Sequence, residues 1–138
     1  MRRVVVPEYL DALPVEDPTA QRSRRDLVLI NGLMGNLRWI RSVLTEKAPG
    51  ARVIEVGAGD GRLASALADD GADVTAVDLG PRPVGCAASV RWIQGDVNTV
   101  LSDLEGDVVV ASLFWHHFQE ADLCKVGSLL GRFRGVVA

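Results

Sequence analysis

The sequence predicts an α/β domain with an open, mainly parallel sheet of about five strands, helices on both faces, and further helices ahead of the sheet. Short apolar segments alternate with segments of helical periodicity from residue 50 to residue 138, which is the pattern of repeated β-α-β units. The most informative stretch, residues 52–78, joins a β-branched segment, a turn with three glycines, an amphipathic segment and an apolar segment that ends on a carboxylate. Glycines at such a turn let the backbone bend sharply and approach a ligand, so this stretch outlines a nucleotide site.

The residues ahead of the sheet divide into two parts. Residues 1–17 carry prolines and scattered acids, which indicate an extended arm. Residues 18–48 predict two helices that are separated at Gly35, the second of them capped by Asn36. We expect both parts to belong to a single domain with the α/β core of residues 50–138.

The elements of the core are expected from apolar runs and from the residues that interrupt them. Pro81, Pro83 and Gly85 argue against a helix between the second and third strands. We expect Trp39 and Trp92 to lie in the hydrophobic core. Strands are predicted at about 52–56, 73–77, 90–93, 107–112 and 135–138, and helices at about 60–70, 97–104 and 121–132.

Composition excludes several classes of protein. The chain has 138 residues, of which 48% are apolar and 24% charged, as in one ordinary globular domain. Its net charge of -3 gives no general attraction to nucleic acid or anionic lipid, and Arg22, Arg24 and Arg25 fit a solvated helix face. No apolar run approaches the roughly 18 residues that cross a bilayer, and none resembles a secretion signal. Cys86 and Cys124 lie far apart without metal-ligand spacing, so we expect no metal, two small apolar side chains, and a cytoplasmic location.

The spacing of the glycines separates two kinds of nucleotide site. A dinucleotide fingerprint needs G-x-G-x-x-G, but the glycines here are Gly57, Gly59 and Gly61, and Arg62 stands where the third would fall. A nucleotide-dependent oxidoreductase is therefore disfavoured, and no Gly-Lys-Ser or Gly-Lys-Thr follows to make a phosphate loop. Several carboxylates at the carboxyl edge of the sheet would oppose a diphosphate and suit a cationic ligand with ribose hydroxyls. These are Glu55, Asp60, Asp78 and Asp96.

In these features the sequence resembles the class I S-adenosylmethionine-dependent methyltransferases, which have a Rossmann-like fold. Their first motif, an acid two residues before Gly-x-Gly-x-Gly, is similar to residues 55–61. Their acid at the end of strand two looks like Asp78, and their Gly-Asp pair after strand three looks like Gly95-Asp96. The segment after strand four, residues 112–117, resembles that of small-molecule members with a His-His pair. The resemblance covers about residues 50–138.

The resemblance implies roles for individual residues toward S-adenosylmethionine. Asp78 would accept hydrogen bonds from both ribose hydroxyls, and Asp96 would accept one from the adenine amino group. Glu55 would form the floor and reach the amino group of the methionine portion. The full set of expected cofactor-binding residues is Glu55, Gly57, Ala58, Gly59, Gly61, Asp78, Leu79, Gly95, Asp96, Val97 and Ser112.

Several of these residues have a second interpretation. Asp60 and Asp96 fit helix N-caps as well as they fit ligand contacts. Phe114 and Trp115 fit either the core or a pocket wall, where an aromatic face would attract a sulfonium. His116 and His117 are the candidates for a catalytic base, since imidazole titrates near neutral pH, although a structural role is the commoner one for a histidine.

The resemblance also narrows the reaction. Methyl transfer is an in-line displacement in which the protein aligns the reacting atoms and excludes water. The end of strand four lacks the Asn-Pro-Pro-Tyr, Asp-Pro-Pro-Tyr and Pro-Cys signatures of methylases acting on macromolecular amino groups or on cytosine. A small-molecule acceptor is therefore expected, without nucleic acid or membrane as a partner, and residues 31–39 resemble the lid of such sites.

The sequence departs from the family in its length. Full members carry two more strands after the fifth, so residues 50–138 are expected to be a C-terminally truncated core with an exposed sheet edge. Such an edge favours a homodimer. It also leaves an alternative to a probable enzyme, namely a truncated or degenerate relative that binds cofactor or a protein partner without catalysis.

Overall fold

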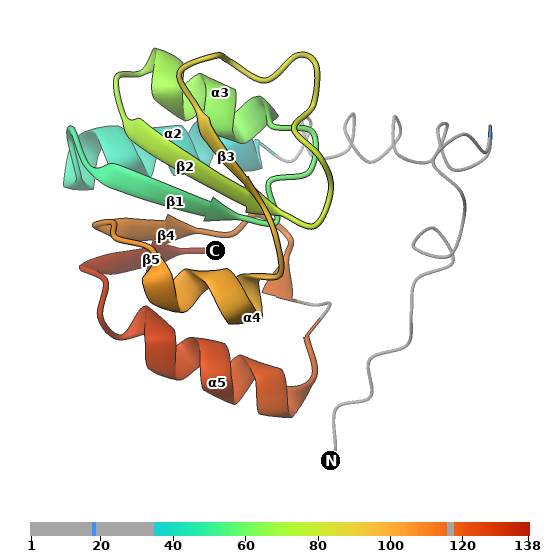
Figure 1. The fold of residues 1–138 in the computed structure, drawn as a ribbon. Helices are drawn as coiled ribbons and strands as arrows, with labels where there is room; N and C mark the ends of the chain where they lie inside the picture. Colours follow the sequence, from blue (N-terminus) through green and yellow to red (C-terminus); the bar gives the residue numbers. More distant parts are fainter. Residues whose placement is uncertain (1–17, 19–34, 116–117) are drawn as a thin grey trace.

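The computed structural model describes residue 18 and residues 35–115 and 118–138, and the elements follow the predicted alternation of strands and helices (Figure 1). The predicted extended arm of residues 1–17 and the first predicted helix lie outside these residues. In chain order the elements are α2 (Asn36–Lys47), β1 (Arg52–Val56), α3 (Arg62–Asp69), β2 (Asp73–Asp78), β3 (Arg91–Gln94), α4 (Val97–Val100), the 3-10 turn η1 (Leu101–Asp103), β4 (Val108–Val110), α5 (Glu120–Leu130) and β5 (Gly135–Val137).

The five strands form one sheet in the order β3-β2-β1-β4-β5, and every pair is parallel. The order reverses next to β1, which pairs with β2 on one side and with β4 on the other. Ligands of open parallel sheets bind at such a reversal, outside the carboxyl ends of the strands. The fold therefore places the end of β1, where the glycine turn begins, at the expected binding position.

Helices cover both faces of the sheet (Figure 1). Neighbouring residues of a strand therefore pack into two different hydrophobic cores, one on each face. In β1, Val53 packs toward α2 and α3, whereas Ile54 belongs to the core beneath α4 and α5. Val108 and Val109 of β4 divide in the same way. Strands that are buried on both faces must be apolar throughout, which is why the β-branched runs in the sequence located them well.

Some expectations were wrong in detail. Trp39 is 53% exposed rather than a core residue, and Cys124 is exposed whereas Cys86 is buried. Gly35, at φ 73°, is the N-cap of α2, so Asn36 is its first residue rather than its cap. Trp92 is half-buried against the core, and its indole N–H donates to the carbonyl of Gly80 at 3.2 Å.

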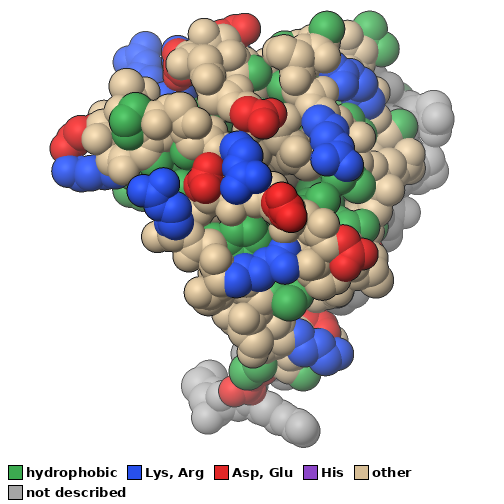
Figure 2. Space-filling model, turned by 60° about the vertical axis from the view of Figure 1, so that its left-hand side comes forward, with side chains coloured by type: hydrophobic (Ala, Val, Ile, Leu, Met, Phe, Trp, Pro, Cys, Tyr) green, Lys and Arg blue, Asp and Glu red, His purple; other side chains and the backbone are tan. Residues whose placement is uncertain are grey.

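The described surface carries charges of both signs. Figure 2 shows Lys and Arg side chains interspersed with Asp and Glu side chains on one face. At the amino ends of β1 and β4, Arg52 lies 3.5 Å from Asp107 and 3.6 Å from Glu105, while Arg41 of α2 pairs with Asp70 after α3. None of the helices in the described ranges is long and apolar enough to cross a membrane.

Candidate functional site

The glycine turn after β1 is held in a conformation that glycine alone adopts easily. Gly57, Gly59 and Gly61 have φ values of 68°, 53° and 71°, in the left-handed region that disfavours residues with a Cβ. The backbone N–H groups of Gly57 and Ala58 donate to the carbonyl of Val77 at 2.9 and 3.2 Å. The turn is therefore tied to the carboxyl end of the neighbouring strand β2.

Asp78, the last residue of β2, binds two loops through its carboxylate. Its Oδ2 accepts from the backbone N–H of Gly59 and its Oδ1 from that of Gly80, both at 2.8 Å. Each oxygen has a further lone pair and can accept from a ligand as well. Asp78 thus fixes the glycine turn against the start of the β2–β3 loop at the carboxyl edge.

Glu55 is the only buried residue with an ionisable acidic or basic side chain in the described part of the chain, and 3% of its surface is exposed. The pKa of Glu55 is raised to about 8, mainly by burial and also by the negative charges of Asp60 and Asp78, while the backbone N–H of Ala64 opposes the shift. Within the described part of the chain, Glu55 Oε2 has no hydrogen-bond partner. A buried polar atom without a partner is costly, so this oxygen marks a place where a ligand's donor would be stabilising.

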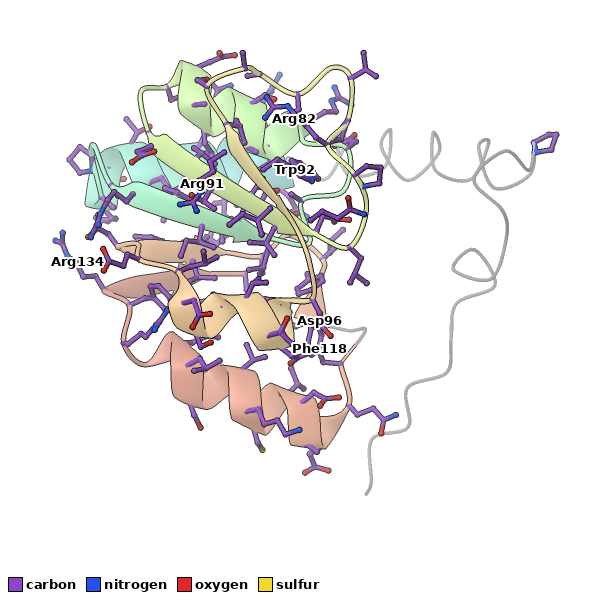
Figure 3. All side chains as sticks on the ribbon, in the orientation of Figure 1. Arg82, Arg91, Trp92, Asp96, Phe118 and Arg134 are labelled. Carbon is purple, nitrogen blue, oxygen red and sulfur yellow. The ribbon has the colours of Figure 1, made fainter. Side chains whose placement is uncertain are left out.

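The loop between β2 and β3 has no helix, as the prolines predicted, and is held by side chains instead. Arg82 donates from its guanidinium to the carbonyls of Val90, Cys86 and Ala87, and Figure 3 shows Arg82 and Trp92 at this loop. Ser65 of α3 joins the loop to the glycine turn, because its Oγ donates to the Gly61 carbonyl at 2.7 Å and accepts from the Ala87 N–H at 2.9 Å.

This double role predicts the effect of removing the hydroxyl. Ser65→Ala would leave the partly buried Ala87 N–H without its acceptor, and we expect it to lower the free energy of unfolding by about 1 to 2 kcal/mol in urea titrations. Ser128→Ala is the matched control, since Ser128 Oγ donates to the carbonyl four residues earlier, Cys124, at 3.0 Å on an exposed helix face. Ser128→Ala should lower the free energy of unfolding less than Ser65→Ala does. Equal decreases for the two variants would contradict the bridging role of Ser65.

Asp96 is an N-cap in this structure, as one of its two interpretations predicted. Its Oδ1 accepts from the backbone N–H of Asn98 at 2.8 Å and from Asn98 Nδ2 at 3.0 Å, at the start of α4. Gly95 lies close to α4, because a Cβ built on it would be 2.9 Å from Val100 Cγ1. Figure 3 shows Asp96 on the side of the sheet away from Arg134.

The segment after β4 reaches the glycine turn from the other side. Ser112 is half-buried, and Leu113 has φ 53°, a strained value for a residue with a side chain. The Phe114 ring follows and lies directly against Gly57. His116 and His117 lie outside the described residues. Residues 35–115 and 118–138 contain no cluster of three potential metal-ligating side chains.

The predicted cofactor-binding residues thus gather at one edge of the sheet from four segments: the turn after β1, the ends of β2 and β3, and the segment after β4. Leu79 is 74% exposed there, Ala58 and Val97 are buried, and Asp60 accepts from the Arg62 N–H at 3.2 Å. Sequence reasoning missed Ser65 and Arg82, whose partners are backbone atoms of a loop. No pattern in the sequence could have identified them.

A comparison with protein families identifies this arrangement. Residues 54–126, more than half of the chain, match the family described as methyltransferase domain. The chain belongs to this family. It is a class I S-adenosylmethionine-dependent methyltransferase domain, and S-adenosylmethionine is the cofactor of the family.

Solved structures share the methyltransferase fold. The 1,6-didemethyltoxoflavin-N1-methyltransferase of Burkholderia thailandensis, solved with 1,6-didemethyltoxoflavin and S-adenosylhomocysteine, is 22% identical with a TM-score of 0.53, over 90% of this chain and 68% of that one. A TehB-like methyltransferase of Corynebacterium glutamicum is 23% identical with a TM-score of 0.61, over 86% and 71%. The glycopeptide N-methyltransferase MtfA is 24% identical with a TM-score of 0.56, over 86% and 57%. A comparison with curated protein sequences gives no significant match.

These coverages show that the methyltransferase domain described here spans between 57% and 71% of the length of those three proteins. Its residues also fit the chemistry of the family's cofactor. The Glu55 oxygen that has no partner among the described residues suits an ammonium donor, and the neighbouring carboxylates of Asp60 and Asp78 favour positive charge. The left-handed glycine turn gives close access to backbone atoms.

Proposed function

We propose that this methyltransferase domain binds S-adenosylmethionine at the carboxyl edge of the sheet and transfers its methyl group to a small-molecule acceptor. One observation carries the proposal: among the residues that the structure describes, the buried carboxyl group of Glu55 has an oxygen without a hydrogen-bond partner, two residues before a left-handed glycine turn that the Asp78 carboxylate holds in place. Structural sites usually satisfy their buried polar atoms internally. An oxygen left unpaired beside a glycine turn supports a ligand with a positively charged donor.

Individual residues have distinct roles in this proposal. Glu55 accepts from the ammonium of the methionine portion, and Asp78 accepts from the ribose hydroxyls while keeping its bonds to Gly59 and Gly80. Asp96 accepts from the adenine amino group, beside Val97 and the exposed Leu79. Gly57, Ala58, Gly59, Gly61, Gly95 and Ser112 line the remaining path through backbone atoms.

In methyl transfer the main contribution of the protein is to position the reacting groups. When bound, S-adenosylmethionine supplies a methyl group already activated by its sulfonium. The chain's own residues hold the acceptor in line with that group and exclude water, which lowers the entropic cost of the reaction. For a hydroxyl acceptor, His116 or His117 takes the proton.

The proposal includes a cytoplasmic location and a homodimer through the edge strand β5, whose Val136 is 43% exposed.

The proposal is tested by calorimetric titration with S-adenosylhomocysteine, followed by transfer assays from S-adenosylmethionine with a panel of hydroxyl, amine and carbon-acid small molecules. We expect saturable binding at one site and transfer to at least one class of acceptor. No binding at millimolar ligand would contradict the proposal, and tight binding of NADH in a parallel titration would favour an oxidoreductase. Binding without transfer to any acceptor would favour the non-catalytic alternative.

A further inference from the structure

The Phe114 ring occupies the space directly over the first glycine of the turn. A Cβ atom built on Gly57 would lie 2.2 Å from Phe114 Cδ2 and 2.7 Å from Cγ, far closer than real side chains approach one another. The ring is therefore in contact with the α-carbon of Gly57 itself. The absence of a side chain at Gly57 accommodates this ring, and the same opening is what a glycine turn offers to a ligand.

The backbone just before the ring is strained, and aromatic packing around the ring opposes that strain. Leu113, immediately before it, has φ 53° and is 46% exposed, so its side chain gains little from burial in return for the strained backbone. On its other side, the Phe114 ring meets Trp115 and Phe118, with ring centroids 5.4 and 4.9 Å away. Apolar packing against Gly57 and the two rings thus maintains a backbone angle that leucine does not prefer.

We propose that Phe114, in the conformation seen here, closes the cofactor site and must leave Gly57 before S-adenosylmethionine binds, with Leu113 as the hinge. This inference rests on the proposed function. A ring in contact with the Gly57 α-carbon and a ligand lying along the glycine turn compete for the same space. Relief of the strain at Leu113 offsets part of the packing lost when the ring leaves.

The competition has a defined thermodynamic form. If only a fraction of the molecules has the ring displaced, the apparent dissociation constant of any ligand of the site is raised by the reciprocal of that fraction. The factor is the same for a cationic and an uncharged ligand, because it belongs to the protein alone. If Phe114 were instead a fixed part of the pocket wall, its ring would contact the bound ligand. It would then favour S-adenosylmethionine over S-adenosylhomocysteine, since an aromatic face attracts a sulfonium more than a thioether.

The test compares S-adenosylmethionine with S-adenosylhomocysteine, which lacks the sulfonium charge. We expect Phe114→Ala to bind both ligands more tightly, by about tenfold and by the same factor, with Phe114→Leu intermediate. Phe133→Ala is the matched control, because Phe133 is a partly buried ring packed against the same core, in the turn before β5. It should leave both affinities unchanged. Unchanged or weaker binding by Phe114→Ala, or a selective loss for S-adenosylmethionine, would overturn the closure.

A second measurement needs no ligand and checks the contact itself. Gly57→Ala introduces a Cβ into the Phe114 ring, so its loss of stability in urea should be smaller when Phe114 is already alanine. Equal losses in the two backgrounds would show that the ring does not cover Gly57, and would overturn the proposal. If neither the wild type nor Phe114→Ala binds either ligand, the proposed function fails together with the closure. If the wild type binds and Phe114→Ala gains nothing, the closure alone fails.

Discussion

Glu55→Gln is expected to become more stable than the wild type as the pH rises, by about 4 kcal/mol between pH 5 and pH 9. In the folded protein, burial raises the pKa of Glu55 from 4.5 to about 8. A raised carboxyl pKa contributes stability that is fully present below the unfolded value, near 4.5, and is lost as the pH rises toward 8. Glutamine has nearly the same shape as protonated glutamic acid and does not ionise, so the variant avoids this loss.

The measurement is urea unfolding of both proteins at pH 5, 7 and 9. Glu105→Gln is the matched control, since the Glu105 side chain is 89% exposed. Its free energy of unfolding, plotted against pH, should give a curve parallel to that of the wild type. Parallel curves for Glu55→Gln as well would show that Glu55 is ionised in the folded protein. The same variant should weaken binding of S-adenosylhomocysteine if Glu55 receives the ammonium, because a bound ammonium favours the ionised form of Glu55 and an amide cannot ionise.

Asp78→Ala is expected to weaken binding of S-adenosylhomocysteine by about 1 to 3 kcal/mol, roughly 5- to 150-fold. The substitution removes the acceptors of the Gly59 and Gly80 N–H groups together with the proposed acceptor of the ribose hydroxyls. Asp78→Asn should lose less than alanine, because its amide oxygen can still accept from one of the two N–H groups. Calorimetry measures both effects directly.

Two controls separate these roles. Asp73→Ala removes an exposed carboxylate at the other end of the same strand and should leave the affinity unchanged. An analogue of S-adenosylhomocysteine without ribose hydroxyls should lose less affinity on Asp78→Ala than the complete ligand does. An equal loss for both ligands would mean that Asp78 acts only by holding the glycine turn.

The sequence predicted the fold closely wherever burial on both faces imposed a composition. The strand predicted at 52–56 is β1 without change, because its residues fill two cores. The strand predicted at 107–112 is shorter, Val108–Val110, since its register with β1 and β5 ends there. Trp39 was misplaced because it stands next to Ile40, about 100° away around the helix, and the apolar stripe of Ile40 and Leu44 leaves it outside.

The sequence predicted that the candidate residues share one edge of the sheet, and it did not predict their contacts. Glycine spacing and acids at strand ends singled out Glu55, Gly57, Asp78 and Asp96, which the structure places at or near the carboxyl ends of β1, β2 and β3. That Asp78 accepts from two backbone N–H groups depends on loop conformations that no short pattern encodes. The position of the Phe114 ring over Gly57 depends equally on the backbone angle φ of Leu113. Leucine gives no indication in a sequence of a left-handed backbone.

The central position of β1 also governs the order in which the chain can fold during synthesis. Its partner on one side follows closely, with Arg52 opposite Asp73, but its partner on the other side pairs Val53 with Val108, 55 residues later. Long-range parallel pairing is slow, and an unpaired apolar strand edge invites aggregation. While the ribosome adds those residues, one edge of β1 stays open and Gly57 stays uncovered. The nascent chain is therefore most prone to aggregation in this interval, which ends when β4 has been synthesised and can pair with β1.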